Sequence, residues 1–206
     1  MTRLPLTLRQ ATADERDVIL DLLEATVRWL RSKGIDQWSK PWPDEERRNK
    51  RISRDLSEGK TWLALDDATV AGTITVDPAD NDVWPAEKRR EKAVYIRRVI
   101  VGRRYAGLGL GARLLDWADD VGAHVHEARW IRIDVWTTNR RLHAYYRKQG
   151  FRFSGLRDPG DDPDYPSRAL FERSTGRGRH DYRAVLKPSV PLPADSAITG
   201  RRTDDD

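Results

Sequence analysis

The chain has 206 residues, of which 38% are hydrophobic and 34% charged, and it contains no cysteine. This length suits one domain with a substantial core. No apolar run approaches the roughly 18–20 residues of a membrane helix, and the N-terminus lacks the apolar segment of a secretory signal. Without cysteine, disulfides, thiolate metal sites and cysteine nucleophiles are excluded, so a cytoplasmic protein without membrane association is expected.

The net charge of +5 and the pI of about 9.6 fit either a nucleic acid or an anionic ligand such as a nucleotide phosphate. The basic residues are mostly arginine and are scattered along the chain. A solvated arginine-rich surface explains them equally well, so charge alone does not choose a function.

The first part of the chain predicts a strand at residues 6–9 followed by two helices. From Asp14 onward, apolar residues recur every three or four positions, and Gly34 is a typical helix end. A loop rich in tryptophan and proline, 34–43, then leads to a strongly charged helix over 44–58.

The later part predicts strands that alternate with helices. The strand-like segments, rich in Val, Ile, Thr and Trp, are 61–65, 70–76, 93–101, 130–136, 151–154 and 169–172. Helices follow a glycine-rich turn at 103–111 and begin again at Asn139, to end at Gly150. The order predicts an α/β (mixed α+β) fold, with a partly parallel central sheet of about seven strands flanked by about four helices.

The domain is predicted to span residues 1–173. Beyond it, residues 174–206 are polar and rich in Arg, Pro and Asp, which favours a largely disordered tail.

The turn at 103–111 has the features of a phosphate-binding site. Gly107, Gly109 and Gly111 stand at every second position where a helix begins, so the backbone can approach a ligand and its N–H groups point outward. The sequence lacks the Lys-Ser/Thr of a P-loop, and the glycine spacing does not fit GxGxxG. A glycine-rich helix start without function remains an alternative.

The run VIVGRRYAGLGLGARLLDWA, residues 99–118, resembles the coenzyme A-binding motif of the GNAT superfamily of N-acetyltransferases. The core of that motif is Arg/Gln-x-x-Gly-x-Gly/Ala, which Arg104, Gly107 and Gly109 match. A second segment, NRRLHAYYRKQGF at 139–151, is similar to the family pattern Asn-x₆-Tyr-x₃-Gly-Phe. The two segments come in the family's order, with a helix and a strand between them.

The resemblance, which covers about residues 5–173, implies acetyl-CoA as co-substrate and no metal. Backbone amides of the glycine turn would bind the pyrophosphate, and the main chain of Val99 and Val101 would bind the pantetheine arm. The N–H near Val99 would also polarise the thioester carbonyl. The strands at 94–101 and 130–136 would splay apart to admit the cofactor. The implied cofactor-binding residues are Val99, Ile100, Val101, Arg104, Ala106, Gly107, Leu108, Gly109, Leu110, Gly111 and Asn139.

Tyr146 matches the general acid of the family, which would protonate the departing thiolate. A packed core tyrosine is the alternative, and Tyr145 is expected to pack or line the cleft. The general base is open: the strand YIRRVIV lacks a carboxylate, which leaves a water relay, Asp134 or Asp36.

On the acceptor side, Arg97 and Arg98 are adjacent in a strand, so their side chains are expected on opposite faces. One of them could meet a substrate carboxylate, or both could form structural salt bridges. Gln37, Trp38 and Trp42 are candidates for an acceptor wall, with tryptophans that merely pack as the alternative.

The sequence therefore predicts an N-acetyltransferase that acts on a primary amine of a small molecule. A macromolecular acceptor, namely a protein N-terminus, a lysine or an aminoacyl-tRNA, and a non-catalytic coenzyme A sensor remain alternatives. Binding of nucleic acid alone is disfavoured because no aromatic–basic recognition motif is present. His124 and His126 cannot face one metal ion from a helix. A homodimer is an open possibility for this fold.

Overall fold

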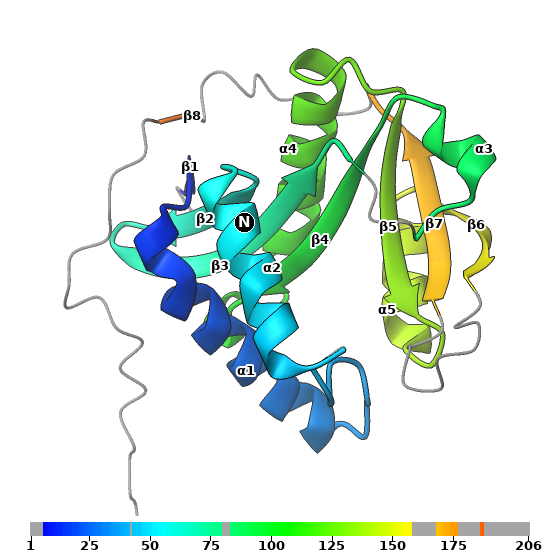
Figure 1. Cartoon of the computed structure of the whole chain (residues 1–206). Coiled ribbons are helices and arrows are strands. Elements are labelled where there is room, and N and C mark those ends of the chain that lie inside the picture. The colour runs from blue at the N-terminus through cyan, green and yellow to red at the C-terminus, as the bar shows by residue number, and fades with distance from the viewer. Residues whose placement is uncertain (1–5, 42, 80–82, 158–167, 177–185, 188–206) are drawn as a thin grey trace, which may run out of the picture.

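A mixed β-sheet forms the centre of the protein. The computed structural model describes residues 6–41, 43–79, 83–157, 168–176 and 186–187. The strands in this part are β1 (Thr7–Gln10), β2 (Thr61–Asp66), β3 (Thr69–Asp77), β4 (Ala93–Val101), β5 (Trp130–Trp136), β6 (Arg152–Arg157), β7 (Arg168–Ser174) and β8 (Leu186–Lys187). They form one sheet in the order β6-β7-β5-β4-β3-β2-β1-β8 (Figure 1).

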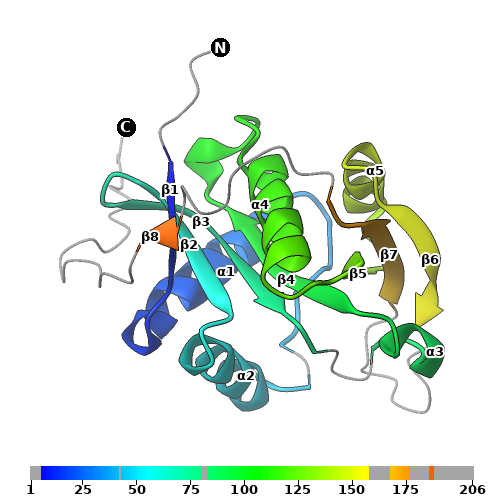
Figure 2. The same cartoon turned by 90° about the horizontal axis from the view of Figure 1, so that it is seen from above.

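Helices cover both faces of the sheet. The helices are α1 (Arg16–Ser32), α2 (Glu45–Ser57), α3 (Ala86–Arg89), α4 (Leu110–His124) and α5 (Arg140–Lys148). α1 and α2 lie on one face and α4 on the other (Figures 1 and 2). The predicted mixed α/β class is confirmed; the four-residue helix α3 was not predicted, because its segment follows Pro85 and reads as an irregular polar stretch.

Each face has its own hydrophobic core. The spacing of apolar residues in α1 buries Ile19, Leu22 and Leu23 against α2 and against Leu63 of β2. On the opposite face, α4 buries Leu114 and its neighbours against β3, β4 and β5 in a larger core that also contains residues of α5. The predicted second helix begins where expected, because Asp44 caps it by accepting a hydrogen bond from the Arg47 N–H (2.7 Å).

The strand β8 lies in the segment predicted as a disordered tail. Leu186 and Lys187 pair in parallel with Leu8 and Arg9 of β1 at the edge of the sheet. The prediction of a largely disordered tail did not include this pairing, which depends on a distant strand and leaves no periodic signal in so short a segment. Residues 177–185 and 188–206 lie outside the described part of the chain.

Candidate active site

The sheet opens between β4 and β5. These strands pair in parallel from Ala93 with Trp130 to Ile96 with Ile133, and their register ends there. Beyond that point β4 stays bonded to β3, and β5 stays bonded to β7. The two strands therefore diverge, as Figure 1 shows, and β4 turns the main-chain groups of its second half toward a gap.

A cleft of about 690 Å³ occupies this gap. Its walls come from the diverging halves of β4 and β5, from α1, α2 and α5, from the ends of β6 and β7 that face them, and from the loop that follows α1. Val99 of β4 and Tyr146 of α5 both line it, as do Gln37 and Trp38 of the loop. The structure thus brings together predicted site residues that are more than 100 positions apart in sequence. Trp42, the third residue of the predicted acceptor wall, lies outside the described residues.

A β-bulge lies at the mouth of the gap. β3 and β4 pair as Thr73 with Ile100 and as Thr75 with Arg97, so β4 has one residue more than β3 between these pairs. Arg98 within the bulge has a φ of +47°, which is uncommon for a residue with a side chain. The bulge ends the regular alternation of side chains just before Val99.

The bulge corrects the prediction that Arg97 and Arg98 point to opposite faces. Arg97 is ion-paired with Asp77 (3.0 Å), and Arg98 donates a hydrogen bond to the Thr75 hydroxyl (3.1 Å). Because Thr75 and Asp77 are two residues apart in β3, they share a face of the sheet. Both arginines accordingly line the same cleft. Arg98 is also ion-paired with Asp55 of α2, a carboxylate that is 1% exposed, so salt bridges hold both arginines.

The glycine turn directly follows the open end of β4. Gly107 and Gly109 have φ values of +80° and +78°, and nothing lies within 4 Å of the position a Cβ would take at either residue. Gly109 is the N-cap of α4, whose first turn leaves backbone N–H groups without intrahelical acceptors. Leu108 between them is 54% exposed. Tyr105, Ala106 and Leu108 donate their N–H groups to backbone carbonyls within the turn. The groups that this segment offers a pyrophosphate are therefore the N–H groups at the N-terminus of α4.

Gly111 serves packing rather than an open surface. A Cβ at this position would come within 2.7 Å of the Tyr145 hydroxyl oxygen and within 3.7 Å of Val101. The missing side chain lets α5 pack closely against the start of α4. Tyr145 packs against the core here, which confirms one of the two expectations for it.

Tyr146 belongs both to the core and to the wall of the cleft. It is 4% exposed, and its ring makes an edge contact with Phe151 at a centroid distance of 5.6 Å. Burial raises the pKa of the Tyr146 phenol above its ordinary value, and the negative charge of Asp134 adds to this. The hydroxyl is therefore protonated at neutral pH, as a proton donor must be. Its role as the acid remains a prediction.

Two hydrogen bonds join the loop after α1 to the turn before α5. Asn139 accepts a hydrogen bond from the Leu142 N–H (3.1 Å), which caps α5, and it donates to the Gln37 side chain (2.7 Å). Thr138 donates to Asp36 (2.7 Å). Asn139 and Gln37 are each 5% exposed. These contacts fix Asn139 at the start of α5 and tie it to the loop after α1. Its role at the co-substrate stays a prediction.

The carboxylates considered as a general base are engaged with other groups. Asp134 is ion-paired with Arg168 (2.9 Å), and Asp36 accepts the hydrogen bond from Thr138. Among the described residues that line the cleft, Asp55 and Asp134 are the carboxylates, and each is bound to an arginine. The sequence did not point to Arg51, Arg54, Asp55 or Arg168, because the acceptor side draws them from α2 and β7.

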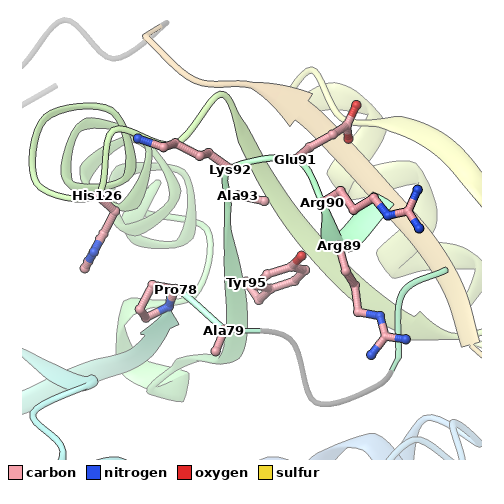
Figure 3. A pocket seen from close by; sticks show the side chains of 9 residues that line it. All are labelled: Pro78, Ala79, Arg89, Arg90, Glu91, Lys92, Ala93, Tyr95 and His126. Carbon is pink, nitrogen blue, oxygen red and sulfur yellow. The ribbon is translucent and has the colours of Figure 1, made fainter. Parts of the chain in front are cut away.

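A second pocket, of about 460 Å³, lies at the other end of β4 (Figure 3). It surrounds Tyr95, with Arg89 and Arg90 to one side and His126 to the other. None of the predicted site residues line it, and the β4–β5 ladder is closed here. In the described part of the chain, no cluster of three His, Asp or Glu could hold a metal ion, and no helix is long and apolar enough to cross a membrane.

Comparison with known proteins agrees with this architecture. Residues 22–151 match the model of the Acetyltransferase (GNAT) family. The chain is 33% identical over 149 residues to the uncharacterized N-acetyltransferase YesJ of Bacillus subtilis, covering 70% of this chain and 81% of that protein.

Solved structures show the same fold. A GNAT family acetyltransferase from Listeria monocytogenes matches with a TM-score of 0.66 at 25% identity, covering 82% of this chain and 94% of that one. Another, from Streptococcus agalactiae, matches with a TM-score of 0.65 at 20% identity, covering 85% and 98%. The chain belongs to the GNAT family of acetyltransferases. It is an acyltransferase of a family that uses acetyl-CoA as co-substrate.

Proposed function

We propose that the protein moves an acetyl group directly from acetyl-CoA to a primary amine of a small molecule. The observation that carries the proposal is the gap between β4 and β5, which has Tyr146 in its wall, with the glycine turn directly after β4 in the chain. A cleft of about 690 Å³ suits a small acceptor better than a folded macromolecule.

The chain offers backbone groups to one substrate. Within the segment from Arg104 to Gly111, the N–H groups at the N-terminus of α4 would bind the pyrophosphate. The β5-facing main chain of Val99 and Val101 would bind the pantetheine arm. Because the pairing of β4 with β5 ends at Ile96, the main-chain groups that follow on this edge of β4 are available for such bonds. A backbone N–H at Val99 would stabilise the negative charge that develops on the thioester oxygen.

The transfer needs a proton donor for the departing thiolate, and Tyr146 suits this role. The neutral amine attacks the thioester carbonyl carbon, a C–N bond forms and the C–S bond breaks. The departing thiolate takes the phenolic proton of Tyr146, and the nitrogen loses a proton to water or to a base. The raised pKa keeps the Tyr146 phenol protonated and makes it a weaker acid, so its proton passes only to a strongly basic group such as the departing thiolate.

The test is release of free thiol from acetyl-CoA in the presence of an amine panel. In Tyr146→Phe, kcat should fall about 100–1000-fold while acetyl-CoA binds as before, because the buried ring is kept and only the hydroxyl is lost. Tyr145→Phe is the matched control and should keep kcat within about threefold, because its ring packs against α4. Equal loss in both variants, or none in either, would overturn the role given to Tyr146.

A further inference from the structure

The β-bulge of β4 keeps Arg98 in a backbone conformation that few residues with a side chain adopt. At the bulge, β3 supplies one residue, Ile74, where β4 supplies two, Arg98 and Val99. The φ of Arg98 is +47°, in the left-handed region that is unfavourable for residues with a Cβ atom. Such a conformation persists only where the surrounding structure holds it. Other contacts of this segment must therefore offset the strain at Arg98.

The Arg98 side chain has buried partners on two other elements. Its guanidinium is ion-paired with Asp55 of α2 and donates a hydrogen bond to the Thr75 hydroxyl of β3 (3.1 Å). The Thr75 hydroxyl is also hydrogen-bonded to the Thr61 hydroxyl of β2 (3.0 Å). Asp55, Thr75 and Thr61 are each at most 1% exposed, so little solvent competes for these bonds.

Helix α2 gives Asp55 a fixed position. Ile52 and Leu56 of the same helix are buried in the core that also contains residues of α1 and β2. A carboxylate on a helix packed in this way cannot readily follow a partner that moves. Asp55 also lies 3.6 Å from the more exposed Arg54, so its closest charged contact is Arg98. The ion pair therefore anchors the bulge of β4 to α2.

The conformation at Arg98 sets the direction of one backbone N–H. The N–H of Val99 belongs to the planar peptide unit that joins Arg98 to Val99, so it turns with the backbone torsions on either side of that unit. Val99 lies beyond Ile96, where the pairing of β4 with β5 ends, and it lines the cleft. This is the N–H assigned above to the thioester oxygen. A rotation of the peptide unit would misdirect it, and hydrogen bonds weaken steeply with poor alignment.

We propose that Asp55 and Arg98 are positioning residues for acetyl transfer, and that their ion pair holds the bulge so that the Val99 N–H points at the thioester oxygen. Neither side chain touches the reacting atoms in this role. The inference rests on the proposed acetyl transfer and adds to it a dependence on α2. Because the hydrogen bond to the oxygen strengthens as negative charge develops there, loss of the ion pair should lower kcat more than it raises KM.

The experiment separates positioning from stability with a double variant of the full-length protein. Arg98→Met with Asp55→Leu removes the ion pair without leaving a buried charge, so most of the free energy of unfolding should be kept. With the most active amine of the panel, kcat should still be at least about tenfold below that of the wild type, and KM for both substrates within about threefold.

A second double variant tests the backbone directly. Arg98→Gly with Asp55→Leu lacks the same two charged groups, but glycine adopts a φ near +47° without strain. Its kcat should therefore be at least about threefold higher than that of the variant with methionine. A role of Arg98 in binding the acceptor predicts no such difference, because both variants lack the guanidinium.

Arg9→Met is the matched control for lost stability. Arg9 of β1 donates a hydrogen bond to Glu15 (2.8 Å) within an ion pair whose side chains are 5% and 6% exposed. Strands β2 and β3 separate β1 from β4 in the sheet. Arg9→Met should lower the free energy of unfolding but keep kcat within about twofold of the wild type, because the site is distant.

Asp55→Asn serves if the double variants do not fold. It is nearly isosteric and keeps a hydrogen bond to Arg98 but loses the charge, so kcat should fall at least about threefold. An unchanged kcat in Asp55→Asn would overturn the inference.

Three results with the double variants would also overturn it: wild-type kcat in both, equally low kcat in both, or a raised KM for the amine at unchanged kcat. The last result would show that Arg98 binds the acceptor. If the wild type neither binds acetyl-CoA nor acetylates any amine, the proposed function itself fails. The two failures are therefore distinguishable.

Discussion

The two halves of the cleft are built in different ways. On the side assigned to the co-substrate, the binding groups are main-chain atoms of one continuous segment, β4 and the glycine turn that follows it. On the acceptor side, they are side chains from α2, the bulge of β4 and β7, balanced by distant carboxylates. A backbone site needs a specific local conformation, whereas a side-chain site needs a specific tertiary arrangement.

This difference suggests that changes in the first half should affect ligand binding with little effect on the rest of the fold. Changes in the second half should affect stability and acceptor choice together, because its side chains both line the cleft and hold elements of the fold to one another.

The largest effect is expected at Gly109. In Gly109→Glu the new side chain is strained by the φ of +78° and places a negative charge where a pyrophosphate would bind. Calorimetric titration should show acetyl-CoA binding weakened by at least about 100-fold.

The matched control is Gly34→Glu. Gly34 also has a positive φ, +66°, and open space around its missing Cβ, but it lies just past the end of α1. The Gly34→Glu substitution imposes the same backbone strain and adds the same charge away from the turn. This variant should therefore bind acetyl-CoA as the wild type does. Equal loss in both variants would show a general folding defect instead of a site.

The acceptor half should show its structural role at Arg98. In Arg98→Met, the buried Asp55 loses its closest ion-pair partner and keeps the longer pair with Arg54 (3.6 Å), so the free energy of unfolding should fall by about 2 kcal/mol. Adding Asp55→Leu should recover much of this loss.

Arg97→Met is the control for this prediction. Its partner Asp77 keeps an ion pair with Lys60 (3.0 Å), so the loss should be smaller, about 1 kcal/mol. Denaturant unfolding measures all three variants. A larger loss for Arg97→Met than for Arg98→Met would contradict the assignment of Arg98 as the main link between β4 and α2.

The smallest effects are expected where the two halves meet, at the bond between Asn139 and Gln37. Gln37→Ala should cost about 1 kcal/mol, because it removes one buried hydrogen bond. Asn139→Ala loses that bond and also the cap of α5, which adds about 1 kcal/mol. Equal unfolding free energies for the two variants would show that the cap contributes nothing.

The same contrast explains what the sequence could predict. Hydrophobic periodicity and glycine spacing act over a few residues. They therefore predicted the β4 segment, the glycine turn and the Asn139–Phe151 segment. The two segments that contain the predicted acetyl-CoA motif and Tyr146 therefore matched the structure closely, including Asn139 at the start of α5.

The arrangement of side chains on the acceptor side could not be predicted from such local patterns. The bulge at Arg98 arises from the register of β3 against β4, which no local pattern records. It puts Arg97 and Arg98 on one face of the sheet, where the sequence predicted opposite faces. The pairing of β8 with β1 and the meeting of α2 with β7 likewise depend on contacts between distant segments. A single sequence does not specify which of many arginines converge.

The central claim is that acetyl-CoA binds to the free edge of β4 and to the turn that follows it. Amide hydrogen exchange with and without acetyl-CoA tests this directly, since it measures protection segment by segment. The account predicts added protection concentrated in peptides that cover residues 97–111, with β2 and the Tyr95 pocket unchanged. Protection confined to residues around that pocket, or absent from 97–111 despite saturating acetyl-CoA, would contradict it.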